Sequence, residues 1–430
     1  MTKYNVWSIV PRLKSMQVIP IKWVFVVKDN GKRKACLVAV GSRDKEVYSP
    51  VDTASPTPTS ATIRWLLALS VKYNWNIIQL DGKNAFLNGE IDRVKYVSIP
   101  PGLTVSSKKY VCHLKKSLYG LATAPKCWNK TFHAFMVSIG FVQNIREPCI
   151  YTKSSNGCII ILLVYVDDIL ITGSDHEGVV SMCEELKSRF DIRDLGFPST
   201  FVGIQVTKTE NGNLFLHQTT YIKSMLEKFG CLEKKTVAET PLLPQASHKN
   251  LKCQYSNALF SYRSALGALM YAANYTRLDI AFAVNFLARY QTDPTDLHWT
   301  LLMRLFAYLD GTPEIGLLYS CTTNELDVYS DADFAGDNST RRSTTGYVVH
   351  LFGCPIAWAS RLQPCIAESS GEAEQIAVCD ATHQALFIAR LMEETLGISM
   401  FPIMLFEDNN AAISISTKST TKSRIKHVEL

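Results

Sequence analysis

The spacing of hydrophobic positions changes along the chain between a period of two, which predicts strands, and a period near 3.6, which predicts helices. In the first half, the predicted strands cover residues 21–27, 35–40, 76–80, 159–166 and 169–172, and the predicted helices cover residues 61–73, 128–139 and 176–190. The first two strands flank Asn30-Gly31, a dipeptide that favours a tight hairpin turn. The 61–73 helix is expected to bury one face, formed by Ile63, Leu66, Leu67 and Ser70.

The second half contains a stretch of mixed polarity at residues 235–256, which we interpret as a linker. Helices are predicted after it over residues 262–290 and 296–309. A different pattern begins at Asp327, with a strand there and further strands predicted over 345–352, 356–360 and 402–406, and a long helix over 371–396. The last hundred residues therefore form a separate unit of mixed strands and helix.

The composition is that of a globular protein large enough for more than one core. The chain has 430 residues, of which 47% are hydrophobic and 20% are charged, so the length suggests two to three domains. The longest apolar run, residues 159–166, is far too short to span a bilayer, and the chain starts without an apolar signal segment, so no membrane partner is expected. The twelve cysteines form no C-x-x-C pair, which favours a reduced, intracellular setting.

Charge is distributed unevenly. From Leu326 to Leu430 there are 8 Lys+Arg against 13 Asp+Glu, which leaves 37 against 26 in the preceding residues. The excess of positive charge before Leu326 is suited to binding a polyanion such as a nucleic acid. The same excess is also common in proteins that never contact nucleic acid, so charge alone leaves both interpretations open.

Three aspartates have a pattern typical of divalent-metal chemistry. Asp167 and Asp168 separate two β-branched runs that predict a tight hairpin, and Asp81 ends a predicted strand. Mg²⁺ prefers hard oxygen ligands, and clustered carboxylates can hold the two ions used in transfer of a nucleotidyl group. Aspartate also favours turns, so Asp167-Asp168 alone favours a solvated β-turn over a catalytic site.

The aspartates lie within a series of motifs, which are Lys22-Trp23-Val24-Phe25, Gln79-Leu80-Asp81, Asn84-Ala85-Phe86-Leu87-Asn88-Gly89, Ser117-Leu118-Tyr119-Gly120-Leu121, Leu163-Val164-Tyr165-Val166-Asp167-Asp168-Ile169-Leu170 and Asp194-Leu195-Gly196. In this order and spacing they resemble the reverse transcriptase–ribonuclease H region of copia-type (Pseudoviridae-like) LTR retrotransposon Pol polyproteins. The resemblance extends from about Trp7 to the last residue.

The resemblance implies an α+β right-hand polymerase with fingers, palm and thumb, followed by an α/β ribonuclease H-like domain. The implied borders are 7–243 for the reverse transcriptase, 244–325 for the thumb and connection helices, and 326–430 for the ribonuclease H-like domain. The implied activity is RNA-directed DNA polymerisation, with Mg²⁺ or Mn²⁺, two per active site, as cofactor. The implied partners are an RNA or DNA template with a DNA primer, and deoxynucleoside triphosphates. Cytoplasmic virus-like particles and the nucleus both remain open as locations.

The resemblance also assigns roles to single residues. Asp81, Asp167 and Asp168 match the family's catalytic, metal-binding aspartates. Phe86 matches the aromatic residue that floors the sugar pocket and excludes a 2′-hydroxyl, although a core role for its ring is the simpler alternative. Tyr119 and Gly120 match the segment that lines the incoming nucleotide and the template base.

A second acidic set is expected in the last hundred residues. Asp331 lies in a predicted strand, Glu374 near the start of the long helix and Asp408 just past a strand, and they match three of the four ribonuclease H carboxylates that catalyse and bind metal. Each acid alone would be interpreted as a surface residue, and Glu372 is expected to cap the helix instead. The fourth aspartate is missing unless Glu429 replaces it, so we expect a C-terminally truncated domain with impaired hydrolysis.

Two departures from the family pattern keep an alternative open. Cys36 stands where the family has an arginine that grips the triphosphate, and Gly82 follows Asp81 where a β-branched residue is typical. The alternative is a catalytically inactive, nucleic-acid-binding relic of a degenerate transposon copy. A structural or interaction protein is a third hypothesis, for which the sequence provides no specific signal.

Overall fold

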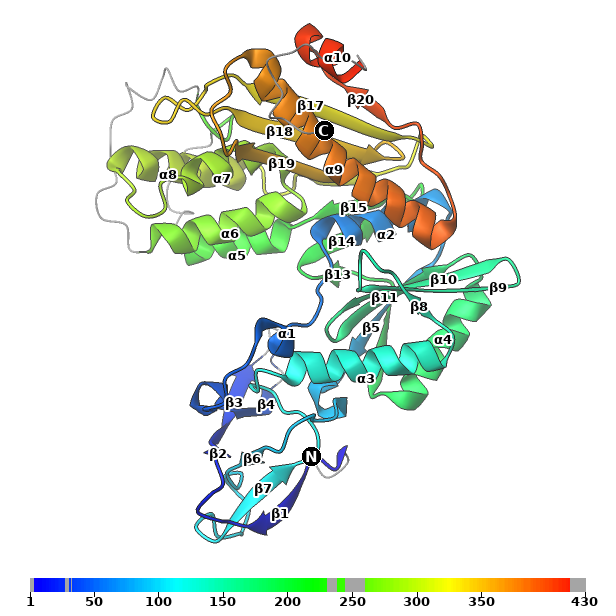
Figure 1. The fold of residues 1–430 in the computed structure, drawn as a ribbon, viewed down its shortest axis with the longest axis vertical. Coiled ribbons are helices and arrows are strands. Elements are labelled where there is room, and N and C mark those ends of the chain that lie inside the picture. Colours follow the sequence, from blue (N-terminus) through cyan, green and yellow to red (C-terminus); the bar gives the residue numbers. More distant parts are fainter. Residues whose placement is uncertain (1–3, 28–30, 32, 230–237, 244–259, 418–430) are drawn as a thin grey trace. The chain divides into compact units, whose positions relative to one another are not determined.

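The computed structural model describes residues 4–27, 31, 33–229, 238–243 and 260–417 (Figure 1). The chain divides into two compact units that do not follow its linear order. Unit 1 contains Met1–Pro58 and Asn76–Phe197, and unit 2 contains Thr59–Trp75 and Pro198–Leu430. The domain borders expected at 243 and 325 were drawn from motifs and stay a prediction. Within the described residues, every helix is too short or too polar to cross a bilayer.

Unit 1 begins with a small sheet and a separate hairpin. The sheet has the strand order β1–β7–β6–β2, formed by Trp7–Pro11, Tyr110–Leu114, Tyr96–Val97 and Val18–Ile19. The hairpin pairs β3 (Ile21–Val27) with β4 (Arg33–Ala39), as predicted. Its turn at Asn30-Gly31 lies largely outside the described residues, and a short helix, α1 (Pro50–Thr53), follows.

The larger sheet of unit 1 carries the polymerase motifs. Its order is β12–β5–β11–β10–β9–β8, formed by Ile192–Gly196, Ile77–Gly82, Asp168–Gly173, Cys158–Tyr165, Ile150–Ser155 and Val142–Gln143. The helices α3 (Ala124–Ser138) and α4 (His176–Arg189) pack against it through one buried cluster that includes Trp128, Phe132 and Leu186. Short strands such as β8 and β12 gave no clear period in the sequence. This sheet therefore fixes both segments that contain the predicted aspartates.

Unit 2 is built partly from a helix of the reverse transcriptase region. The helix α2 (Ser60–Lys72) belongs to it, together with a sheet of order β13–β14–β15–β16, formed by Thr200–Phe201, Ile204–Lys208, Leu214–His217 and Gly316–Tyr319. Every residue from Ala61 to Ser70 is buried, so burial extends from the face formed by Ile63, Leu66, Leu67 and Ser70 to all sides of the helix. The expected linker at 235–256 lies mostly outside the described residues.

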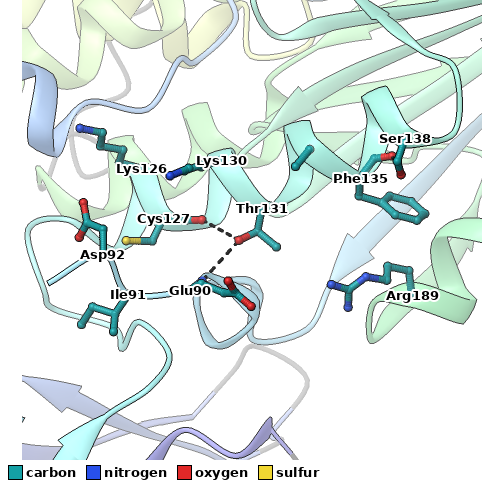
Figure 2. Close-up of a pocket in the computed structure, with 11 residues that line it drawn as sticks. Glu90, Ile91, Asp92, Lys126, Cys127, Lys130, Thr131, Phe135, Ser138 and Arg189 are labelled. Carbon is teal, nitrogen blue, oxygen red and sulfur yellow. Dashed lines mark hydrogen bonds between the residues drawn. The ribbon is translucent and has the colours of Figure 1, made fainter. Parts of the chain in front are cut away.

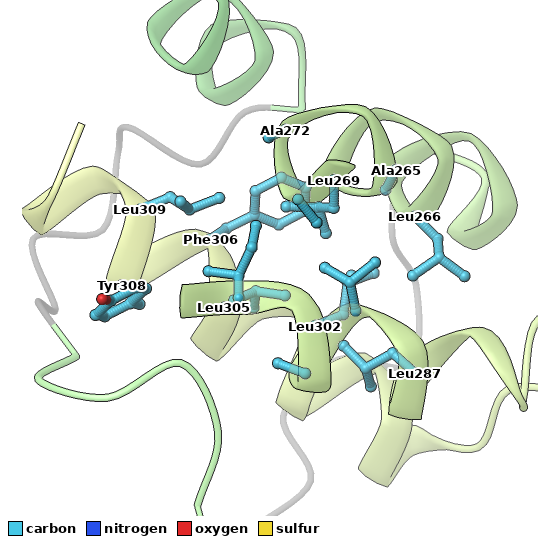
Figure 3. Close-up of a cluster of buried hydrophobic side chains, with 14 of the residues drawn as sticks. Ala265, Leu266, Leu269, Ala272, Leu287, Leu302, Leu305, Phe306, Tyr308 and Leu309 are labelled. Atoms are coloured by element: carbon cyan, nitrogen blue, oxygen red, sulfur yellow. The ribbon is translucent and has the colours of Figure 1, made fainter. Parts of the chain in front are cut away.

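Four helices of unit 2 share one cluster of buried hydrophobic side chains, part of which is shown in Figure 3. They are α5 (Thr219–Lys228), α6 (Tyr262–Tyr275), α7 (Ala281–Ala288) and α8 (Asp296–Gly311). The single helix predicted over 262–290 is two helices separated by a 3₁₀ turn at Leu278–Ile280. At the break, the buried Arg277 guanidinium donates hydrogen bonds to Asp279 and to the carbonyl of Thr312.

The C-terminal part of unit 2 is a four-stranded sheet crossed by one long helix (Figure 1). The strand order is β19–β18–β17–β20, formed by Cys354–Leu362, Thr344–Leu351, Leu326–Asp333 and Met404–Phe406. β20 runs parallel to β17, whereas the other pairs are antiparallel. The helix α9 (Ser370–Leu396) contacts β17 through alanines 332, 373 and 377, and α10 (Asn410–Thr417) follows. This strand–helix–strand arrangement is the one expected for the second acidic set.

Candidate active sites

The turn between β10 and β11 presents Asp167. The two strands pair in register with Tyr165 opposite Asp168, so the turn contains only Val166 and Asp167. Val166 has φ +57°, a conformation that β-branched residues rarely adopt and that costs roughly 1–3 kcal/mol. The indole N–H of Trp128 on α3 donates a 2.6 Å hydrogen bond to the Val166 carbonyl. The core helix therefore anchors a strained turn that carries the acidic group.

The neighbouring strand brings Asp81 to the same place. β11 pairs with β5 so that Asp168 lies directly opposite Asp81, a register that sets their Cα atoms about 4.5–5.5 Å apart. The Gly82 amide donates a 2.8 Å hydrogen bond to the Asp167 carbonyl, and Gly82 is buried. The expected looseness at Gly82 is thus opposed by a direct bond to the hairpin. The three predicted polymerase aspartates lie together.

Their electrostatic environment is that of a crowded acidic cluster. Burial, followed by the charges of Asp167 and Asp81, raises the pKa of Asp168 to about 6, against a hydrogen bond from Gln79. Burial and the Asp81 charge also raise the pKa of Asp167, and the positive charge of Lys34 acts in the opposite direction. Carboxylates that repel one another in this way are stabilised by a bound cation. These oxygens fit the hard ligands that Mg²⁺ or Mn²⁺ requires.

Two aromatic rings lie beside this cluster. Phe86 occupies the 3₁₀ turn Ala85–Asn88, and its ring is 4.7 Å from that of Tyr119. Burial, with Asp167 and Asp81 nearby, raises the pKa of the Tyr119 phenol to about 12. Phe86 is half-buried and packs on two apolar clusters, so its ring also has a core role.

Close packing against β4 explains why a glycine stands at position 120. Its φ is +88°, and a Cβ there would lie 2.1 Å from the carbonyl oxygen of Ala39 at the end of β4. The Ala39 amide donates to the Tyr119 carbonyl at 2.7 Å. The Tyr119-Gly120 segment therefore joins the β3–β4 hairpin to the rest of unit 1, a function that requires glycine whether or not a nucleotide binds.

The second acidic set also converges. Ligand oxygens of Asp331, Glu374 and Asp408 all lie within 4.8 Å of one another. β17 carries Asp331, the first turns of α9 carry Glu374, and Asp408 follows β20. The N-cap of α9 is Ser369, whose side chain accepts a hydrogen bond from the Glu372 amide, and the Glu372 carboxylate accepts one from the Glu368 amide just before the helix.

Glu374 is the buried member of this set. Burial, followed by the charges of Glu407, Asp331 and Asp408, raises its pKa to about 7. Its Oε2 atom is buried without a hydrogen-bond partner. A buried carboxylate oxygen without a hydrogen-bond partner, on a residue beside other acids, is satisfied by a divalent cation, so this donor set fits such an ion.

The sequence reasoning missed the residues that support these sites. Lys34, Gln79 and Trp128 act on the aspartates of unit 1, and Glu407 acts on Glu374. Trp128 lies 38 positions before the carbonyl it binds, and no local pattern signals that contact. Gln79 is part of the predicted motif Gln79-Leu80-Asp81 and Glu407 adjoins the predicted Asp408, which is the one signal that the sequence contains.

A separate cavity of about 620 Å³ lies along α3 in unit 1 (Figure 2). It is lined by Lys126, Lys130 and Arg189 together with Glu90 and Asp92. None of the predicted site residues lines it. The charged residues of its lining have mixed signs and are partly paired, for example Lys126 with Asp52. The lining therefore does not indicate a particular ligand or reaction.

Residues 4–244 match the family model of the reverse transcriptase (RNA-dependent DNA polymerase), which covers more than half of the chain. The chain therefore belongs to this family. The copia-type Pol assignment expected from the motifs is confirmed by its relatives, and the family match supports the α+β polymerase fold class.

The chain is 35% identical over its whole length to the retrovirus-related Pol polyprotein from transposon TNT 1-94 of Nicotiana tabacum, of which it covers 33%. It is 36% identical over 99% of its length to that from transposon RE2 of Arabidopsis thaliana, of which it covers 30%. It thus spans about a third of the length of these relatives. The solved foamy viral protease-reverse transcriptase, in complex with double-stranded DNA, aligns with 97% of this chain and 62% of its own at 14% identity and a TM-score of 0.49.

Proposed function

We propose that unit 1 is an RNA-directed DNA polymerase that extends a DNA primer on an RNA or DNA template. The observation that carries this proposal is the pairing of Asp168 opposite Asp81, with Asp167 in the adjoining two-residue turn. Family membership supports the reaction class, and the convergence of the three aspartates supports this location for it.

In the proposed reaction the primer 3′-oxygen attacks the α-phosphorus of a deoxynucleoside triphosphate, and pyrophosphate leaves. Asp81, Asp167 and Asp168 would hold two Mg²⁺ or Mn²⁺ ions, which lower the pKa of the attacking hydroxyl and neutralise the leaving group. Phe86, packed on Tyr119, supports exclusion of a 2′-hydroxyl by its bulk. Lys34 is the cation that acts on Asp167 from the β3–β4 hairpin, and we propose that it takes over triphosphate contact where Cys36 cannot.

We further propose that Asp331, Glu374 and Asp408 hold divalent cations for hydrolysis of the RNA strand of an RNA–DNA hybrid. Their convergence and the unpartnered Glu374 oxygen support this role.

Primer extension tests the polymerase proposal. The full chain, given a labelled DNA primer on an RNA template, deoxynucleotides and Mg²⁺ or Mn²⁺, should extend the primer. Asp167→Asn with Asp168→Asn should lower the rate by at least 10³-fold, because loss of the metal ligands removes several kcal/mol of transition-state stabilisation. The matched control is Asp92→Asn, an exposed acid of unit 1. Salt-dependent primer–template binding without incorporation would instead support the inactive relic.

A further inference from the structure

Two cysteine sulfurs meet in unit 2, and neither cysteine belongs to the predicted acidic sets. The Sγ atoms of Cys321 and Cys354 are 3.6 Å apart, although the residues are 33 positions apart. Cys321 lies in the segment between β16 and β17, and Cys354 is the first residue of β19. The backbones run side by side here, since the Phe352 amide donates to the Glu325 carbonyl at 2.9 Å.

The two thiols differ in access to solvent. Cys354 is 1% exposed, whereas Cys321 is half-buried. The Cys321 thiol also lies 3.4 Å from the carbonyl of Ala68 on α2, so the pair lies where three segments of unit 2 meet. The hydrogen bond with Cys321 lowers the pKa of Cys354, and the positive charge of Lys72 acts in the same direction. A lowered thiol pKa favours the thiolate, which is the reactive form.

We propose that Cys321 and Cys354 are a redox modification site, a dithiol that a peroxide converts reversibly to a disulfide. Hydrogen peroxide reaches the half-buried Cys321 sulfur, which is oxidised to a sulfenic acid, and one water is released. The Cys354 thiolate then attacks the Cys321 sulfur, the S–S bond forms and the S–O bond breaks. The departing oxygen takes up the proton that the Cys354 thiol has released and leaves as a second water. Two thiols and one peroxide thus give one disulfide and two waters. A dithiol reductant reverses the change.

The cross-link requires little movement. The sulfurs must approach by about 1.5 Å to reach the S–S bond length of about 2.05 Å. The disulfide would tie the segment after β16 to the start of β19, beside α2. Because it restricts the unfolded chain across β17 and β18, the oxidised protein should melt several degrees higher than the reduced one. This inference concerns stability and is independent of the catalytic proposals.

The test uses the full chain, first reduced and then treated with hydrogen peroxide. Free thiols are blocked in denaturant with N-ethylmaleimide, and the protein is analysed by intact mass and peptide mapping. The reduced chain, with its 12 cysteines, should take up twelve adducts, and the oxidised chain should take up ten. A linked peptide containing Cys321 and Cys354 should appear and vanish on reduction. The thermal midpoint should rise in parallel.

Cys321→Ser is the principal variant, because this half-buried residue tolerates a small polar replacement better than the buried Cys354. It should abolish both the cross-link and the rise in melting temperature. Cys365→Ser, at an exposed cysteine, should change neither. Oxidation of Cys321 or Cys365 without the linked peptide would overturn the proposal, and so would a linked peptide with no rise in melting temperature.

Discussion

At Val166 a β-branched residue occupies a left-handed conformation between the strands that carry the polymerase aspartates. Such strain persists only where the surroundings fix the backbone. The hydrogen bond from Trp128 is the contact that fixes it, because the indole reaches the Val166 carbonyl from the core side of the sheet. The position of Asp167 therefore depends on a residue that has no catalytic group.

Replacing Trp128 with Phe tests this dependence. The ring remains but the hydrogen bond is lost, so primer extension should fall about 10-fold, which corresponds to about 1.4 kcal/mol. The measurement is kcat for single-nucleotide incorporation. Phe132→Leu is the control, since Phe132 belongs to the same buried cluster without bonding the turn. If both variants lose activity only to the extent that they lose stability, the role of Trp128 in anchoring the turn is wrong.

Glu374 gives a pH-dependent prediction. Its pKa of about 7 in the folded protein is above the ordinary value of 4.5, so the folded state binds its proton more tightly. The resulting stability is complete below pH 4.5 and is lost as pH rises through 7. In EDTA at pH 8, Glu374→Gln should therefore be more stable than wild type by roughly 3 kcal/mol, and the difference should vanish near pH 4.5.

Chemical denaturation at the two pH values measures this difference. Glu393→Gln, at an exposed position of the same helix, should follow wild type at both. The same Glu374 variant should also lose any cleavage of an RNA–DNA hybrid in Mg²⁺. Equal stability of wild type and Glu374→Gln at pH 8 would show that the carboxylate is not crowded by its neighbours.

Among the secondary-structure elements, α2 differs most from its sequence pattern. Its Arg64 is buried, donates to the carbonyls of Ile356, Asn274 and Tyr275, and stacks 3.8 Å from the Trp358 ring. Burial lowers its pKa to about 10, so it is still a cation at neutral pH. One guanidinium thus connects α2 with β19 and the end of α6.

Arg64→Leu should destabilise unit 2 by roughly 3 kcal/mol, because it leaves buried carbonyls without donors. Urea denaturation followed by Trp fluorescence measures the change. Arg263→Leu, at an exposed position of α6, should shift stability by less than about 0.5 kcal/mol. Similar curves for the two variants would mean that the α2 contact contributes little.

At the scale of the whole molecule, unit 2 is discontinuous in sequence. It takes residues 59–75 from one side of the polymerase motifs and residues from 198 onward from the other. The intervening segment, 76–197, begins and ends on adjacent strands, since Gln79 pairs with Gly196. Its two ends are therefore close together, and a short linker can replace it.

This arrangement predicts the behaviour of two fragments. Residues 59–75 joined by a Gly/Ser linker to 198–430 should unfold cooperatively on heating, because α2 fills its buried site. Residues 198–430 alone should lack that transition, since removal of α2 exposes the surface that buries ten of its residues. Circular dichroism melting distinguishes them. An equally cooperative 198–430 fragment would show that α2 is dispensable.

The sequence by itself determined the local elements and predicted the chemistry. Strong hydrophobic periods placed α4, α9 and the β10–β11 hairpin within a few residues. The resemblance of the motifs to a known family predicted metal-binding roles for Asp81, Asp167 and Asp168 and for Asp331, Glu374 and Asp408. These features depend on side-chain alternation and on residue type, which a linear pattern records directly.

Only the tertiary structure decided how these elements combine. The strand register that sets Asp168 opposite Asp81, the bond from Trp128 to Val166, the break at Arg277 and the burial of α2 in unit 2 all depend on contacts between distant residues. A hydrogen bond or a buried face contributes free energy only when its partner group is in contact with it. The local sequence pattern does not identify that partner.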